Sequence, residues 1–407
     1  MLLSLIDLPF KLDKDNFNIF IIISFILSTL SSLLWFYNSK SNPPKPLPSK
    51  LAQNNKRKPG HWIPEDYKFP KPQPYPNWNI YDSDPIAYRP FKHKYNVTMG
   101  IRNMNPEEWI EIDNKWLEFH ELKKQRLQTK GKDLYGTLPI AYDASLELLD
   151  ELKNYLPERY PSMFKYNSTT GVLSNLITGE DWGTFDLKTK EIDPMFIITN
   201  LLQDDIAIMI ELEDGQYYLK AGAIVLPGFW RLTDKLNMPL SEIHTSGDVP
   251  KYNTHLKKSM EKFFTRLKPE TSVLRNNYFI QTDKHLDWSS SIGKESEQGV
   301  GWYTAPVATD INQIYYRSER QSLRKLPKTG AVVFTIRTYF IPIIEIVDEP
   351  YVPLRLLNGL TSWSNDVREY KGFNKFKDVL LPYLEGKAKE QEVLGYTREN
   401  EKDNFPL

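Results

Sequence analysis

The sequence predicts an α+β fold in which helices flank a central, mostly antiparallel sheet of five or six strands. Helical periodicity with N-cap signals is confined to separate segments, and six strand-like runs follow one another along the chain. No G-x-G-x-x-G motif after a strand, no P-loop and no H-E-x-x-H motif occurs, so nucleotide, flavin and zinc-protease signatures are missing. Mixed helices and hairpin-linked strands favour the α+β class.

Helices are expected where apolar residues recur at a spacing of three to four. In residues 104–127, Asn105 is a suitable N-cap, Pro106 stands at the first helical position, and apolar side chains recur from Trp109 to Leu122. A second amphipathic helix is expected at Asp143–Leu156. Three further helices are expected at about 230–236, at 255–267 and at 373–386.

Strands are expected in runs rich in β-branched and aromatic residues. These runs are 195–199, 205–212, 217–226, 272–280, 313–319 and 331–340. The Asp-Gly-Gln stretch at 214–216 predicts a hairpin turn between the second and third runs.

The composition excludes several kinds of chemistry. The 407 residues carry 52 basic and 52 acidic side chains, so no global positive charge attracts nucleic acid. Cysteine is absent, which rules out disulfides, Cys-ligated zinc, a thiolate nucleophile and the usual iron–sulfur ligation within this chain. Any soft metal or haem must therefore be held by His, Met, Tyr or carboxylate.

The N-terminal region predicts a membrane anchor. After a segment at 1–16, residues 17–37 carry no charge and are long enough to cross a hydrocarbon core of roughly 30 Å. A cleaved signal peptide is the main competitor, but no small-x-small cleavage site follows. Lys and Arg are more frequent on the C-terminal side, which predicts that the bulk of the protein faces the cytosol. The endoplasmic reticulum is favoured as its location, with the mitochondrial outer membrane as the alternative.

Domain boundaries follow from composition. Residues 38–80 are rich in proline and basic residues, which predicts an extended spacer between the anchor and the folded part. The folded domain is expected at 81–349. Residues 350–407 are expected to form a helix and a charged tail, to which the sequence assigns no function.

His244 is the most conspicuous candidate for chemistry, because the chain has only six histidines. It lies in "PLSEIHTSGDVPKY" (239–252) and is expected on a loop that follows a short helix. Three interpretations stay open at this point: a hydrogen-bonded structural histidine, a general base or proton shuttle, and a ligand to a metal or haem. No second histidine or carboxylate at ligand spacing lies nearby, so a two-histidine zinc site is weakly supported.

Five blocks of sequence, in order, resemble the haem-dependent oxidative N-demethylase alpha-subunit-like family. They are "YRPFKHKYNVTMGIRNMNPEEWIEID" (88–113), "YLPERYPSMF" (155–164), "LQDDIAIM" (202–209), "LPGFWRLTDKLNMPLSEIHTSGDVPKY" (226–252) and "YYRSERQSLRKLPKTGAVVFTIRTYFIPI" (315–343). The resemblance implies a PAS-like fold that holds a b-type haem through a histidine. It also implies O₂-dependent demethylation of a small amine, with electrons from a separate reductase that carries flavin and an iron–sulfur cluster.

The resemblance assigns roles to particular residues. His244 matches the family's histidine and is expected to bind the haem iron. Arginines that match family positions are expected to supply partners for the haem propionates; they are Arg231, Arg275, Arg317, Arg320 and Arg324. Asp204 and Asp205 are expected to be catalytic carboxylates. Asp204 stands where the family usually has glutamate, and Tyr278 lies near a position where the family has tryptophan, so two departures fall in the expected pocket.

The leading functional hypothesis is a membrane-anchored haem protein with oxidative N-demethylase-like monooxygenase chemistry. A haem- or ligand-binding sensor without turnover is the alternative, because PAS-like folds host both. A third hypothesis is a haem-free interaction module tethered by its N-terminus. Substrate consumption coupled to NAD(P)H oxidation would separate the first hypothesis from the other two.

Overall fold

The computed structural model describes residues 57–183, 192–301 and 304–402. The chain divides into two units, 1–52 and 53–407, and every described residue belongs to the second. The expected N-terminal segment 1–16, the anchor 17–37 and the first part of the linker 38–80 therefore lie outside the described residues. Among the helices of the described ranges, none combines the length and the apolar character needed to cross a membrane.

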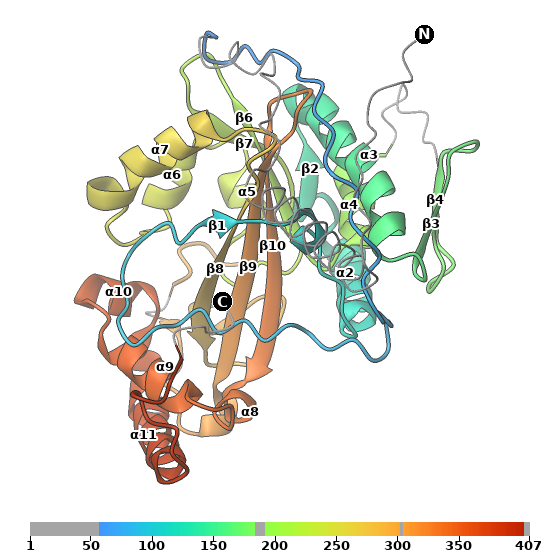
Figure 1. Ribbon diagram of the computed structural model, residues 1–407. Helices are drawn as coiled ribbons and strands as arrows, with labels where there is room; N and C mark the ends of the chain where they lie inside the picture. The colour runs from blue at the N-terminus through green and yellow to red at the C-terminus, as the bar shows by residue number, and fades with distance from the viewer. Residues whose placement is uncertain (1–56, 184–191, 302–303, 403–407) are drawn as a thin grey trace, which may run out of the picture. The chain divides into compact units, whose positions relative to one another are not determined.

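A seven-stranded sheet forms the centre of the fold, with strand order β1-β8-β9-β10-β6-β7-β2 (Figure 1). Every pairing in this order is antiparallel. The strands are β1 (Arg102–Asn103), β2 (Tyr135–Thr137), β6 (Asp205–Glu211), β7 (Tyr217–Ala223), β8 (Val273–Gln281), β9 (Tyr315–Lys325) and β10 (Val332–Pro342). The α+β class and the antiparallel arrangement predicted from the sequence are confirmed. The sheet exceeds the expected five or six strands because the short β1 and β2 extend its two edges.

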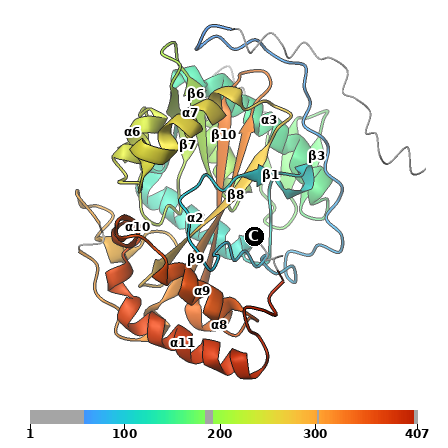
Figure 2. The same ribbon diagram turned by 60° about the vertical axis from the view of Figure 1, so that its left-hand side comes forward.

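Helices cover both faces of this sheet. The longer ones are α2 (Trp116–Lys130), α3 (Tyr142–Arg159), α4 (Pro194–Leu201), α6 (Leu240–Thr245), α7 (Lys257–Arg266), α9 (Val352–Thr361), α10 (Asn365–Tyr370) and α11 (Lys377–Val393). Two views, Figure 1 and Figure 2, place α3 on one side of the sheet and α6 and α7 on the other. The turns α5 (Leu232–Lys235) and α8 (Ile343–Ile346) follow strands, and a π-helical turn (Tyr252–Leu256) leads into α7.

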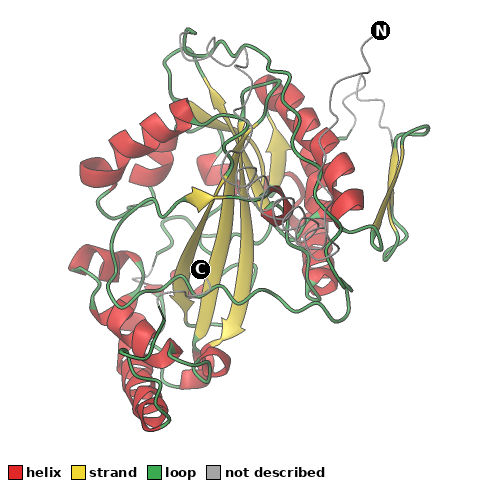
Figure 3. Ribbon diagram, in the orientation of Figure 1, coloured by secondary structure: helices red, strands yellow, loops and turns green. Residues whose placement is uncertain are grey.

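Each layer has its own hydrophobic core. One core joins α3 and α4 to the sheet through residues such as Leu152, Ile198 and Ile206. A second core joins α5, α6 and α7 to the opposite face through Leu232 and Phe264, among others. A third core belongs to the C-terminal helices, which gather at one end of β8, β9 and β10, as Figure 3 shows. The small antiparallel sheet of β3 (Phe164–Asn167), β4 (Val172–Asn175) and β5 (Asp181–Trp182) is separate from the main sheet.

The run 195–199, which the sequence predicts as a strand, forms helix α4. Asp193 caps this helix by accepting a hydrogen bond from the Met195 N–H at 3.0 Å, and Pro194 occupies the first turn. The helix is apolar on nearly all sides because it is buried between α3 and the strands β2 and β7. A short apolar run of this kind does not distinguish a buried helix from a buried strand.

The expected spacer and the expected tail both pack against the fold where the structure describes them. In the second half of the linker, Phe69 packs edge-on against Trp109, and the Trp78 indole N–H donates to the Ile112 carbonyl at 2.8 Å. At the other end, a carboxylate oxygen of Glu401 lies 2.7 Å from His93 Nε2. The compact unit therefore extends beyond the expected domain 81–349 in both directions.

Candidate functional site

Strand β9 separates the predicted site residues onto two faces of the sheet. Successive side chains of a strand point to opposite faces, and β9 pairs with both neighbours without a register shift. Arg317, Glu319 and Gln321 share one face, here called the Glu319 face. Arg320 and Arg324 lie on the other, here called the Arg320 face. The arginines predicted to hold one cofactor are therefore not brought together.

On the Arg320 face, the buried arginines are paired with carboxylates. Arg320 lies 3.1 Å from Glu111, and Arg337 lies 2.6 Å from Asp113. Burial opposes both charges, but the carboxylates outweigh it, so the pKa of each guanidinium is raised. These cations already have their anions.

Arg324 has a structural environment. Its guanidinium lies between two aromatic rings, 3.5 Å from the centroid of Phe69 and 4.0 Å from that of Trp109. It also forms an ion pair with Glu151 of α3 at 2.8 Å. This stacking holds the proline-rich segment, α3 and β9 together.

Asp204 also belongs to the Arg320 face. Its side chain is fully buried, and neither carboxylate oxygen accepts a hydrogen bond from a described residue. Burial raises the pKa of Asp204 to about 6, although Arg337, Arg320 and Lys123 act in the opposite direction. It is a buried acid in the core between the sheet and the helices.

Asp205, by contrast, has a clear structural task. Its carboxylate accepts hydrogen bonds from the backbone N–H groups of Val225 and Leu226 at 2.9–3.3 Å. Arg317, from the other side, donates to the Leu226 carbonyl and to the Leu286 carbonyl, both at 2.8 Å. Asp205 and Arg317 thus fix the chain where it leaves β7.

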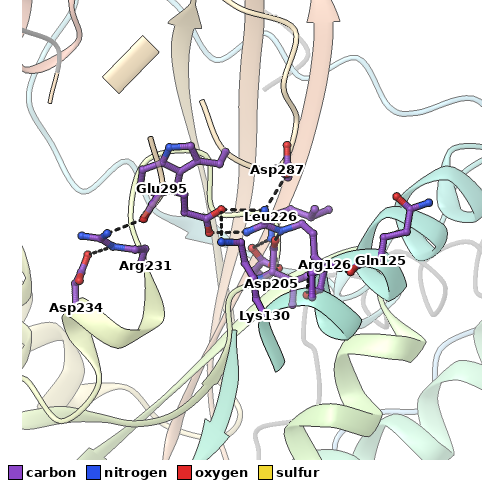
Figure 4. A network of polar contacts seen from close by, with 12 residues as sticks. Gln125, Arg126, Lys130, Asp205, Leu226, Arg231, Asp234, Asp287 and Glu295 are labelled. Carbon is purple, nitrogen blue, oxygen red and sulfur yellow. Dashed lines mark hydrogen bonds and ion pairs between the residues drawn. The ribbon is translucent and has the colours of Figure 1, made fainter. Parts of the chain in front are cut away.

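Arg231 belongs to a polar network that joins three segments (Figure 4). It pairs with Asp234 at 2.7 Å and donates to the carbonyls of Glu295 and Glu297 at 2.7 and 2.9 Å. The Glu295 carboxylate in turn pairs with Arg126 of α2 at 2.7 Å. The network holds the loop after β7 against the loop 284–300.

His244 lies in helix α6, not on the expected loop. Its Nδ1 is 2.8 Å from the carbonyl of Leu240, one turn earlier, and its ring stacks on Tyr252 with centroids 4.9 Å apart. A neutral imidazole that donates from Nδ1 carries its lone pair on Nε2, the form in which histidine binds a metal. Burial lowers the pKa of His244, which favours this neutral form.

A hydrogen-bonded chain lies near His244 on the Glu319 face. Arg275, whose positive charge acts on His244, donates from Nη1 to the Gln321 amide oxygen at 2.8 Å. The Gln321 amide donates to Glu319 at 2.9 Å. Glu319 on β9 is therefore the carboxylate of this hydrogen-bonded chain, and sequence reasoning missed it. The available signal was the alternation in "YRSERQ", which places Glu319 between Arg317 and Gln321.

Lys371 approaches the same face from the C-terminal helices. It follows α10, and its ammonium donates to the Tyr278 carbonyl at 2.5 Å and to Asn277, which pairs with Glu319 in the sheet, at 3.3 Å. The aromatic ring nearest to the ammonium is that of Phe279, at 4.1 Å. Burial lowers the pKa of Lys371 to about 7, against the opposing charge of Glu319.

The two faces differ in their balance of charge. Burial lowers the pKa of Arg275, Arg317 and Lys371 on or beside the Glu319 face, because the carboxylates there do not offset it. On the Arg320 face the pKa values of Arg320 and Arg337 are raised. A surplus of buried positive charge is suited to an anionic ligand, and the Glu319 face is the one near His244.

These features fit a haem group. Haem requires an imidazole lone pair, apolar surface for the porphyrin and cations for its two propionates. The Glu319 side of the sheet supplies His244, the cation Arg275, and the half-buried Phe334 and Ile336 of β10. Within the described ranges, no group of three or more His, Cys, Asp or Glu residues is arranged to hold a metal ion. A single histidine ligand, such as haem accepts, is consistent with that finding.

A comparison with known families gives one match. The model of the family described as haem-dependent oxidative N-demethylase, alpha subunit-like, matches residues 100–381. This range contains both faces of the sheet, His244 and Lys371, and it continues past the expected domain end at 349 into α11.

Proposed function

The chain belongs to the haem-dependent oxidative N-demethylase, alpha subunit-like family, and from this premise we propose that it binds haem b and oxidises a small amine with O₂. The observation that carries the proposal is the contact between His244 Nδ1 and the Leu240 carbonyl, which leaves Nε2 to bind iron. The match spans more than half of the chain. We also propose that the fold is PAS-like.

Haem would lie on the Glu319 face, held by His244 at the iron and by Arg275 at the propionates. When bound, it supplies the one-electron and dioxygen chemistry that side chains lack. The chain has no cysteine and so offers no thiolate ligand, and the His244 imidazole is the ligand proposed here. Arg231 and Arg317 act indirectly, by fixing the loops that border this face.

Glu319 is the group that can exchange a proton or attract an amine on this face. Its side chain is 11% exposed, and its Oε1 lies 3.8 Å from Arg317 Nε, beyond hydrogen-bond length. Its other oxygen accepts from Gln321, which links it to Arg275. Asp204 and Asp205 are not suited to this role. Asp204 lies on the opposite face of the sheet, and the Asp205 carboxylate is already bound to backbone N–H groups.

Turnover requires an electron donor, which we propose is a separate reductase that carries flavin and an iron–sulfur cluster. We also propose that residues 17–37 anchor the protein in the membrane of the endoplasmic reticulum, with the folded unit in the cytosol. The basic residues that follow the apolar segment support this orientation. The mitochondrial outer membrane would give the same arrangement.

The ultraviolet–visible spectrum of the full chain, purified with haem supplied, tests the proposal. The wild type should show a Soret band, and His244→Ala should lose or shift it. His255→Ala is the matched control, because His255 is exposed and its Nδ1 contacts only its neighbour Thr254 in the described structure. A colourless wild type would refute haem binding, and an unchanged band in His244→Ala would assign the iron to another ligand.

A second assay tests turnover. With a reductase and NAD(P)H supplied, the haem-loaded protein should consume a small secondary amine and release formaldehyde. Glu319→Gln should lower this rate without removing the Soret band, because the substitution keeps the shape and removes the charge. Haem binding without amine consumption would leave a sensor in place of an enzyme.

A further inference from the structure

A strongly basic surface segment lies beside His244. Residues 251–268 carry six Lys or Arg side chains and one acidic residue, Glu261, although the chain as a whole is neutral. Helix α7 presents four of the six to solvent, and they are Lys257, Lys258, Lys262 and Arg266. These four form the basic face of α7.

No contact within the described structure offsets the positive charge of these four side chains. Within the described structure, none of the four side chains forms an ion pair or hydrogen bond. Lys258, Lys262 and Arg266 follow one another at a spacing of four, so like charges form a column along the helix and repel one another. Lys257 and Lys258 also lie at the N-terminal end, where the helix dipole disfavours cations.

The basic face is connected to the candidate iron ligand by a short path. The His244 ring stacks on Tyr252, with the planes inclined by 14°. Tyr252 is the first residue of the π-helical turn that continues without a break into α7 at Lys257. Phe264 on the inner side of α7 packs into the same core as Leu240 of α6. The surface charge and the ligand therefore belong to one packed unit.

We propose that the basic face of α7 is the docking surface for an acidic electron-donor protein. This inference rests on the proposed haem function. Electrons enter a buried cofactor where it comes nearest to the surface, and opposite charges raise the rate of encounter between partners by 10- to 1,000-fold at low salt. The nearby acids Glu242 and Asp248 reduce the local charge without reversing it.

The test compares two triple variants of the full chain, purified in a nonionic detergent and loaded with haem. The first replaces Lys257, Lys258 and Lys262 with glutamate. The control replaces Lys68, Lys165 and Lys389 with glutamate; these lysines are exposed, lie on other elements and form no ion pair with a described residue. Both variants change the net charge equally, so a difference between them reports position and not total charge.

The measurement is the second-order rate at which a pre-reduced ferredoxin of acidic surface reduces the haem, followed in the Soret region. At low ionic strength the α7 variant should be slower than the wild type by about tenfold or more, and the control should stay within about twofold. The difference should vanish near 1 M salt, where the Debye length falls to about 3 Å. Equal rates for both variants at low salt would overturn the proposal.

Two further measurements separate other outcomes. Equilibrium titration with dithionite should reduce the haem fully in every variant. If the wild type shows no haem, that result refutes the proposed haem function and does not bear on the docking surface. Binding to phosphatidylcholine vesicles is compared with and without phosphatidylserine. If the α7 variant loses only binding to anionic vesicles and keeps its reduction rate, the face contacts a membrane and the proposal is wrong.

Discussion

Asp205 and Arg317 bind the backbone N–H and the backbone carbonyl of Leu226, respectively. The Asp205 carboxylate accepts the Leu226 N–H at 2.9 Å, while Arg317 Nη2 donates to the Leu226 carbonyl at 2.8 Å. Leu226 follows β7 and begins the loop that leads through Arg231 to the helix with His244. Two buried charges of opposite sign, one on each side of Leu226, fix the start of the segment that carries the candidate ligand.

Arg317→Lys should destabilise the protein by about 3 kcal/mol or more, since one ammonium cannot reach the carbonyls of both Leu226 and Leu286, and a buried acceptor is left unpaired. Chemical denaturation followed by circular dichroism measures the loss. Arg266→Lys, on the exposed face of α7, is the control and should change the free energy of unfolding by less than about 0.5 kcal/mol. Equal effects would mean that Arg317 is not committed to the loop.

Asp204 predicts a pH dependence of stability. Its pKa is raised to about 6 in the folded protein, so the folded state binds the proton more tightly than the unfolded state does. The stabilisation that Asp204 gains from binding this proton in the folded state is fully present below about pH 4. It is lost as the pH rises through about 6. Asp204→Asn removes the titration, so its stability relative to the wild type should increase by about 2–3 kcal/mol between pH 4 and pH 7.

Denaturation curves at several pH values check this expectation. The relevant quantity is the difference between variant and wild type, because other groups titrate equally in both. A difference that stays constant from pH 4 to pH 7 would show that Asp204 is ionised and paired in the folded protein.

The sequence predicts where the strands lie better than which face each charge occupies. Asp204 and Asp205 are neighbours, and the alternation of a strand places neighbours on opposite faces. Which face lies near His244 depends on pairing with β10 and β9, more than 100 residues away. Glu319 was missed for this reason. A glutamate in a strand does not by itself indicate a functional site. Only the register of the strands shows that Glu319 lies near Arg275 and Lys371.

The expected roles of the arginines show the same limit. Motif positions identify Arg317, Arg320 and Arg324 together, but contacts divide them. Arg320 meets Glu111 and Arg324 meets Glu151, whereas Arg317 binds backbone carbonyls on the other face. A carboxylate partner contributed by a distant segment is not visible in the local sequence, so matching positions cannot separate a cofactor ligand from a core ion pair.

The proline-rich segment gives a further prediction. Phe69 contacts both Trp109 and the Arg324 guanidinium, so Phe69→Ala should cost about 2–3 kcal/mol through lost burial and lost cation–π contact. Tyr81→Ala is the control, because Tyr81 is 65% exposed and should change stability by less than about 0.5 kcal/mol. A freely extended spacer would make Phe69→Ala as silent as the control in a thermal denaturation measurement.

The contacts of Arg275 and Arg231, which both border the Glu319 face, predict which of them holds the haem propionates. Arg275→Gln should weaken haem binding by about tenfold, since it removes a charge-assisted contact worth about 1.4 kcal/mol or more. Arg231→Gln should leave affinity within about twofold, because Arg231 is committed to Asp234 and to backbone carbonyls. Titration of each haem-free variant with haem, followed at the Soret band, measures both affinities, with circular dichroism to confirm folding. A greater loss for Arg231→Gln would place the propionates toward the loop 284–300 and away from Glu319.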